Sequence, residues 1–133
     1  MKLTRASSYA LHAVAYMAGQ KKGDPVASHI IAHDRKIPER FLLKVLKPLV
    51  SAQILHSIKG PTGGYRLAKP ANEITMLDVV EAVDGPIRGA APVNPKKPES
   101  LLDRKLEKVC GDIADSLRKH LGKVRMSELG TRD

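Results

Sequence analysis

Apolar residues recur at helical spacing in several stretches of the chain, and polar or glycine-containing breaks separate these stretches. The first stretch predicts a helix that begins after Thr4, whose hydroxyl suits an N-cap, and ends at Gly19. A second, shorter helix is expected over about residues 25–34, with Pro25 in its first turn. Its inward-facing side chains should be Val26, Ile30 and Ile31.

Pro38 is expected to open a third helix, because a proline at the first helical position loses no hydrogen bond. Pro48 lies late in the same stretch and should kink this helix or bring it to an early end. Since the connection over residues 35–37 is short, the second and third helices have the spacing of a helix-turn-helix. The apolar face of the third helix should consist of Phe41, Leu42, Val45, Leu46 and Leu49.

Two short strands and a tight turn follow the third helix. The apolar residues within 54–58 and 65–67 are spaced as in short β-strands. Between them, the glycines and the proline of the segment 59–67 permit positive φ, close backbone approach and a sharp turn. This segment therefore predicts the tip of a β-hairpin, and Lys59 and Arg66 give it a positive charge.

A fourth helix is expected after Thr75, which has with Asp78 the spacing of a capping box, and this helix should end at Gly85. Residues 86–99 hold four of the nine prolines and show no periodicity, which predicts an irregular linker.

Ser100 and Asp103 repeat the capping-box spacing and predict the start of a fifth helix, for which Gly122 is the expected C-terminal stop. An apolar stripe follows this helix on one side. Its members, the expected dimerisation residues, are Leu102, Leu106, Val109, Ile113, Leu117 and Leu121.

These elements predict a mainly α protein with a small β-hairpin wing. We expect a winged helix-turn-helix domain over residues 1–85, a proline-rich loop over 86–99, and a dimerisation helix with a C-terminal tail over 100–133. The stripe on the last helix could pack onto its own domain or onto a second copy. A homodimer is favoured, because two-fold pairing is the commonest symmetric arrangement and would place two recognition helices on successive half-sites.

The formal net charge of +9 is concentrated in one part of the chain. From Arg35 to Lys69, eight cations stand against one acid, Glu39, which gives this segment a net charge of +7. Such a concentration indicates a polyanionic partner, because each neutralised phosphate releases condensed counterions. Charge alone leaves open a merely solvated basic surface.

The third helix and the hairpin together indicate double-stranded DNA as that partner. Arg40 is the first choice for base readout, because its planar guanidinium can bond guanine bidentately, whereas Lys44 and Lys47 are expected to contact phosphates. The candidate DNA-binding residues are Glu39, Arg40, Leu43, Lys44 and Lys47 on the helix, and Lys59, Gly60, Thr62 and Arg66 on the wing. The alternative is a winged-helix module that binds an acidic protein partner.

Other chemistries find less support in the sequence. The glycine-rich turn precedes neither Gly-Lys-Ser/Thr nor a helix, which disfavours a nucleotide-binding loop. His29 and His33 have the spacing of a metal-binding pair on one helix face but lack a third ligand nearby. Cys110, the single cysteine, is expected to be a small hydrophobic residue, with a thiol switch across a two-fold axis as the alternative. No catalytic constellation is recognisable, so the chain is not expected to be an enzyme.

A cytoplasmic location is expected. The N-terminus lacks the apolar segment of a signal peptide, and no apolar run is long enough to span a bilayer. A single cysteine also fits a reducing compartment.

Several segments together resemble a known family. These segments are Leu3-Thr4 with Tyr9-Ala10-Leu11, Ile37-Pro38 with Phe41-Leu42, the wing sequence over residues 60–68, and the helix sequence over 74–85. They look like the family of IscR, NsrR and CymR, bacterial dimeric winged-helix transcription regulators that are also called the Rrf-two family. The similarity spans nearly the whole chain.

This resemblance implies a homodimeric regulator, expected to be a repressor, that binds pseudo-palindromic promoter DNA with the third helix in the major groove and the wing in the minor groove. The residues that match the groove-facing part and the wing tip of the family are Glu39, Arg40, Leu43 and Lys44, and Lys59 and Gly60, respectively.

The chain departs from the family's cluster-binding members. The loop over residues 86–107 has none of the three cysteines that hold their iron–sulfur cluster, and Ser8 stands where the nitric-oxide-sensing members have an Asp ligand. Leu43 replaces a Glu of the iron–sulfur-assembly regulator, so we do not expect the same operators. The chain resembles the cluster-free members, whose signals are a protein partner, a thiol switch or an unknown effector, and no cofactor is expected.

Overall fold

The structure is a computed structural model that describes residues 1–20, 23–91, 96 and 100–130. It is mainly helical with a two-stranded antiparallel hairpin, as the sequence predicts. In chain order the helices and strands are α1 (Arg5–Ala18), α2 (Ser28–Arg35), α3 (Glu39–Ser51), β1 (Leu55–Ile58), β2 (Gly64–Leu67), α4 (Met76–Asp84) and α5 (Leu101–Lys123). Two short 3-10 helices, η2 (Ala71–Glu73) and η3 (Met126–Glu128), precede α4 and follow α5. Among the described residues, no helix combines the length and apolarity that crossing a membrane requires.

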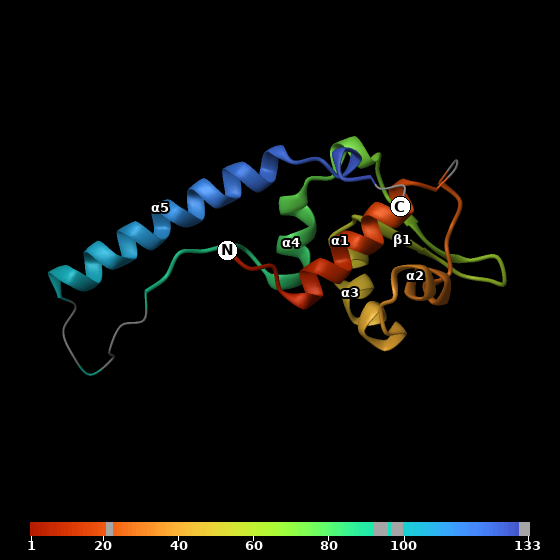
Figure 1. Ribbon diagram of the computed structural model, residues 1–133, viewed down its shortest axis with the longest axis horizontal. Helices are drawn as coiled ribbons and strands as arrows, with labels where there is room; N and C mark the ends of the chain where they lie inside the picture. Colours follow the sequence, from red (N-terminus) through yellow and green to blue (C-terminus); the bar gives the residue numbers. More distant parts are fainter. Residues whose placement is uncertain (21–22, 92–95, 97–99, 131–133) are drawn as a thin grey trace.

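The core lies where α1, α3 and α4 pack together, with α2 and the hairpin along its side (Figure 1). It is aliphatic, and its largest fully buried side chains come from α2, α3, β1 and the segments around α4. They include Ile31, Leu42, Leu46, Leu49, Leu55, Ile74 and Met126. Burial of this apolar surface is the main contribution to folding and fixes how α3 sits against the rest of the domain.

The helix starts agree with the cap signals in the sequence. The Thr4 hydroxyl accepts a hydrogen bond from the Ser7 N–H at 3.0 Å and caps α1. Both expected capping boxes form, with reciprocal bonds between Thr75 and Asp78 before α4 and between Ser100 and Asp103 before α5. Local side-chain bonding to the first turn explains why these starts were predictable from short sequence windows.

The prediction for α2 was wrong at its start. The helix begins at Ser28, and Pro25 and Val26 lie before it in extended chain. The Val26 N–H and C=O exchange 2.8 Å hydrogen bonds with the backbone of Tyr65 on β2, which forms an isolated antiparallel bridge between this segment and the hairpin. Ile30 is 42% exposed, whereas Ile31 is fully buried as predicted.

Two expectations for α3 also need correction. Phe41 was assigned to the apolar face, but its side chain is 38% exposed, while the other four members of that face are buried. Pro48 lies in the last turn of α3, which ends at Ser51, in agreement with the early end expected of this proline. Pro38 is the N-cap residue itself and not the first helical residue.

The C-terminal end of the chain returns to the core. Gly122 lies within α5, which ends at Lys123 and not at the glycine. The next residues then pair with the segment before α4, where the Met76 N–H donates to the Val124 carbonyl at 2.7 Å and the Met126 N–H to the Ile74 carbonyl at 2.8 Å. Met126 is fully buried in the same core as side chains of α1, α3 and α4, and the division of the chain near residue 100 stays a prediction.

Candidate nucleic-acid interface

A tight turn sets the angle between α2 and α3. Lys36 adopts a left-handed conformation at φ 55° and ψ 44°, and the Ile37 N–H donates to the Ala32 carbonyl at 2.9 Å. Ile37 is 5% exposed and anchors the turn in the core. The predicted helix-turn-helix is therefore present and held rigidly at its corner.

Side-chain contacts at both ends hold α2 against its neighbours. The Tyr16 hydroxyl on α1 donates a 2.5 Å hydrogen bond to the Asp34 carboxylate on α2. This bond raises the pKa of Tyr16 and lowers the pKa of Asp34, because it favours the protonated phenol and the ionised carboxylate. At the other end, the Ser28 hydroxyl donates to the Glu39 carboxylate at the start of α3, at 3.1 Å.

The exposed face of α3 carries all five residues that the sequence assigned to DNA. Glu39, Arg40, Leu43, Lys44 and Lys47 are exposed, whereas Leu42, Val45, Leu46 and Leu49 are buried. The division follows from the helical period, which places the two sets on opposite sides. Three cations within two turns give this face the charge that a groove-bound helix requires.

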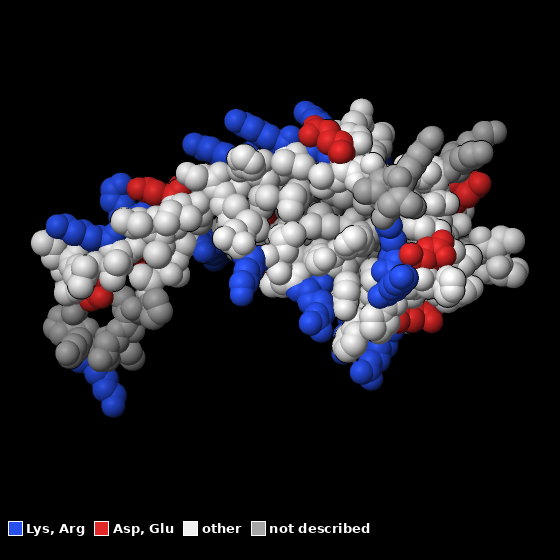
Figure 2. Space-filling model, in the orientation of Figure 1, with Lys and Arg blue, Asp and Glu red and all other residues white. Residues whose placement is uncertain are grey.

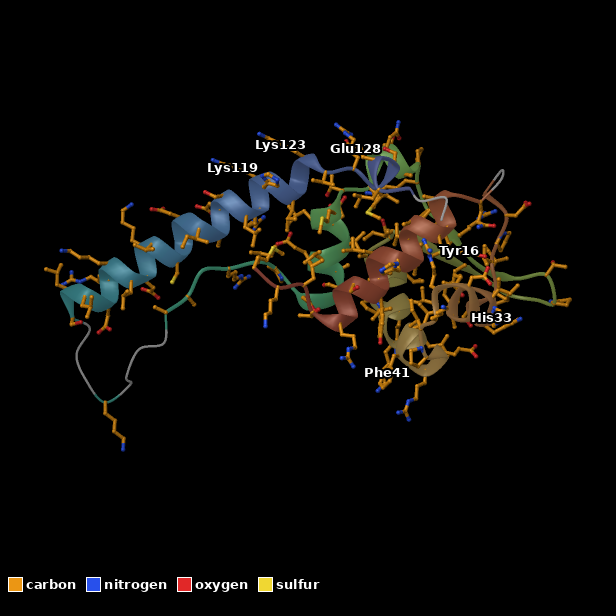
Figure 3. All side chains as sticks on the ribbon, viewed as in Figure 1. Tyr16, His33, Phe41, Lys119, Lys123 and Glu128 are labelled. Atoms are coloured by element: carbon orange, nitrogen blue, oxygen red, sulfur yellow. The ribbon has the colours of Figure 1, made fainter. Side chains whose placement is uncertain are left out.

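The Phe41 ring, which the sequence placed in the core, supports this charged face. The Arg40 guanidinium carbon lies 4.8 Å and the Lys44 ammonium nitrogen 5.6 Å from the ring centroid. Cations at these distances are attracted to the face of the ring. Figure 3 shows Phe41 at the edge of the molecule, where α3 lies. The sequence signal for this role is an aromatic residue, Phe41, with a cation one position before it and another three positions after it.

The wing is a hairpin whose tip is the segment 59–63. Leu55 pairs with Leu67 and Ile58 with Gly64, and the Gly63 N–H closes the turn onto the Gly60 carbonyl at 3.0 Å. Gly60 has φ 105°, a conformation that other residues rarely adopt. Lys59, Gly60 and Thr62 are exposed together at this tip, as predicted from their position in the turn.

Arg66 is separated from the wing tip. It faces His56 on the paired strand and lines a cavity of about 280 Å³ together with Gly23, Asp24 and residues at the end of α1. The structure thus places Arg66 on the flank of the hairpin, beside the turn after α1, although the sequence had grouped it with Lys59. The pairing of Arg66 with His56 produces this separation, and the sequence pattern does not specify the strand register.

Gly64 fixes the hairpin to the body of the domain. A Cβ atom at this position would lie 2.3 Å from the Val26 carbonyl oxygen, which no real contact tolerates. The glycine is therefore required for the close approach of β2 to the segment before α2. The wing therefore packs directly against the segment that leads into the helix-turn-helix.

Cationic side chains gather on two sides of the molecule. Figure 2 shows Lys and Arg along the lower edge, over the start of α1 and α3, and also along the outer edge of α5. On α5 the six cations are interspersed with four acids, and Lys108 pairs with Asp112 at 3.3 Å. The segment from Arg35 to Lys69 has no such balance, since Glu39 is its single acid.

The apolar stripe of α5 divides into two parts. Leu102, Leu106, Val109 and Ile113 are 45–63% exposed on the half of α5 that extends away from the domain (Figure 1). Leu117 is half-buried, and Leu121 is 5% exposed where α5 packs against α4. Among the six residues of the stripe, the four outer side chains are thus exposed, whereas Leu121 is buried within its own chain.

The described residues do not gather into a metal site. No three His, Cys, Asp or Glu side chains among residues 1–20, 23–91, 96 and 100–130 lie close enough to hold an ion. His29 and His33 are both exposed, and His33 lies 3.2 Å from Asp34. Cys110 is half-buried on α5.

Comparison with known proteins agrees with this geometry. Residues 3–132 match the Rrf2 family, described as iron-dependent transcriptional regulators. The chain is similar to a protein of Rhodobacter capsulatus whose name calls it rrf2-like, at 32% identity over 92% of this chain and 77% of the relative. The fold is similar to that of CymR, the global cysteine regulator of Bacillus subtilis, with a TM-score of 0.77 and 24% identity over 98% of this chain and 96% of that one.

Several curated relatives are longer than the matched region. A Mycobacterium tuberculosis protein is 33% identical over 65% of this chain but only 54% of its own length. The chain thus spans about half the length of the first curated relatives it matches.

The iron in the family description does not fit the residues of this chain. Iron–sulfur clusters are held mainly by several cysteine thiolates, and Cys110 is the single cysteine. The part of the chain that the structure describes also offers no group of three His, Cys, Asp or Glu in place of thiolates.

Proposed function

The chain belongs to the Rrf2 family of transcriptional regulators, and from this premise we propose that it is a cluster-free repressor that binds double-stranded operator DNA as a homodimer. It is a DNA-binding regulator by family and not an enzyme. The observation that carries the proposal is the combination of an exposed cationic face on α3 with an exposed wing whose β2 strand is bridged to the segment before α2.

In this proposal α3 enters the major groove, where Arg40 bonds a guanine and Glu39 and Leu43 face neighbouring base edges. Lys44 and Lys47 bind phosphates, which position the helix without specifying sequence. Lys59, Gly60 and Thr62 at the wing tip reach the adjacent minor groove, and Arg66 meets the backbone from the flank of the hairpin.

A homodimer follows from the outer half of α5. Five large apolar side chains are exposed there, Leu101 and the stripe residues Leu102, Leu106, Val109 and Ile113, and pairing with a second α5 would bury apolar surface on the stripe. Two-fold symmetry then places the two copies of α3 on half-sites about 34–36 Å apart, which requires a pseudo-palindromic operator. Bound at a promoter in the cytoplasm, such a dimer represses transcription by occluding the polymerase.

Selection of bound fragments from the host genome tests the proposal. We expect recovered fragments to share a pseudo-palindromic motif in promoters, and the protein to bind this motif about a thousandfold or more tightly than random duplex. Fragments without a shared motif, and equal affinity for random duplex, would contradict sequence-specific binding. Light scattering on the same preparation should give the mass of a dimer.

A further inference from the structure

A cavity opens between α1 and the recognition helix α3. Its volume is about 230 Å³, and it is lined by Arg5, Ala6 and Tyr9 of α1 and by Phe41, Lys44 and Val45 of α3. The lining combines two aromatic rings and two aliphatic side chains with two cations, and it includes no acidic side chain. The cavity is smaller than the pockets of about 300–1,000 Å³ that hold drug-sized ligands, so it suits a small molecule.

The chemistry of this lining selects an anion with a flat apolar body. Arg5 and Lys44 form no ion pair with any residue that the structure describes, so an anion between them would meet two positive groups. The Tyr9 and Phe41 rings favour an aromatic ring, which can lie against them in an offset or edge-to-face arrangement. We propose that this cavity is an effector site for a small aromatic carboxylate, and that its occupation weakens DNA binding.

The coupling to DNA runs through α3 itself. Lys44 lines the cavity and is also a phosphate contact in the proposed function, and the Phe41 ring lies under both Lys44 and Arg40. A carboxylate that binds Lys44 removes a cation from the DNA surface, so ligand and phosphate compete for it. Linkage then requires that DNA weaken ligand binding by the same factor. The antagonism between ligand and DNA rests on the proposed function, whereas ligand binding to the cavity does not.

Binding to the free protein tests the site without DNA. The probe is 2-naphthoate, followed by chemical-shift changes in two-dimensional NMR spectra, with 2-naphthamide as the neutral analogue and decanoate as the flexible anion. We expect saturable binding of 2-naphthoate with shifts at Ala6, Tyr9 and Phe41, and binding about fivefold weaker for the amide. No saturable binding, or tighter binding of decanoate, would overturn the assignment.

Two variants locate the site. Ala6→Phe fills the cavity and should abolish 2-naphthoate binding, and an unchanged affinity for DNA shows that this variant is folded. Arg5→Gln should weaken 2-naphthoate binding about fivefold, while the matched Arg104→Gln on α5 should leave it unchanged. Equal binding by Ala6→Phe and the unaltered chain would place the ligand elsewhere.

The coupling is measured by DNA affinity at saturating 2-naphthoate, with acetate at equal ionic strength as the control. We expect a loss of about fivefold or more in the unaltered chain and none in Ala6→Phe. If 2-naphthoate binds the cavity but leaves DNA affinity unchanged, the antagonism is wrong. If the unliganded protein does not bind DNA, the proposed function fails independently of the site.

Discussion

Helices α3 and α5 are both amphipathic, but they leave opposite kinds of surface uncovered. The apolar face of α3 is buried within the chain, and what remains exposed is a row of cations on Arg40, Lys44 and Lys47. On the outer half of α5 the chain at Gly89 approaches the backbone of Cys110 closely, but the apolar set Leu102, Leu106, Val109 and Ile113 remains exposed. One helix is therefore suited to a polyanion and the other to an apolar surface.

This difference shows that amphipathicity alone does not assign a helix to a role. The face of a helix that packs against the rest of the chain is buried, and the opposite face is left exposed to a partner. α3 packs against α1, α2, α4 and β1, whereas α5 touches α4 near its C-terminal end. The proposed division of labour, with α3 for DNA and α5 for a second copy, depends on this asymmetry.

The largest expected effect is at the proposed dimer surface of α5. Ile113→Glu places a charge at the inner end of the exposed stripe, and burial of an unpaired charge costs several kcal/mol. We expect a monomer by light scattering, with helix content unchanged in circular dichroism. Lys119→Glu, on the outer edge of α5 (Figure 3), is the matched control and should remain a dimer. A dimeric Ile113→Glu variant would remove α5 from the interface.

Next in size is the loss of base readout. Arg40→Ala should cost about 1–3 kcal/mol at one base position of each half-site and relax the preference there. Competition between operators that differ at single positions measures this change. Uniform weakening across all positions would instead make Arg40 a phosphate contact.

Removal of the two capping boxes is expected to have a smaller effect, and one that differs between the start of α4 and the start of α5. Thr75→Ala should lower the free energy of unfolding in urea by about 1 kcal/mol, because the first turn of α4 adjoins the fully buried Ile74. Ser100→Ala removes the same cap from the exposed end of α5, so we expect faster amide exchange over residues 101–104 and little change in global unfolding. Equal losses in both variants would show that the start of α5 is part of the cooperative core.

The smallest effect is expected at the wing. Lys59→Ala should weaken binding evenly across DNA sequences, by about 1 kcal/mol or less, and lower the salt slope by about one for each wing. Gln53→Ala, an exposed position without charge before β1, is the control. If neither Lys59→Ala nor Arg40→Ala alters DNA affinity in a salt titration, the recognition surface is assigned wrongly.

Local signals in the sequence predicted much of this fold. The caps at Thr4, Thr75 and Ser100 and the helical period of α3 act within one or two turns, so short windows contain them. The start of α2 was missed because Val26 pairs with Tyr65, a partner distant in sequence that overrides the helical preference of this segment. The packing of Met126 beside α4 depends likewise on distant contacts.

The candidate site shows the same limit. Exposure of the α3 face followed from periodicity, and exposure of the wing tip followed from its turn residues. The position of Arg66, the support of Arg40 and Lys44 by Phe41, and the burial of Leu121 depend on register and packing angles. Periodicity specifies which residues share a face, but it does not specify which other residues of the chain pack against that face.

A salt titration of binding to random duplex DNA tests the central claim most directly. Cations on α3 and the wing of two protomers should release counterions from several phosphates. We expect log K to fall linearly with log salt, with a slope of magnitude at least about four. An acidic protein partner in place of DNA is the competing explanation of the charge. A flat titration, or no binding to duplex at low salt, would contradict DNA recognition by this surface.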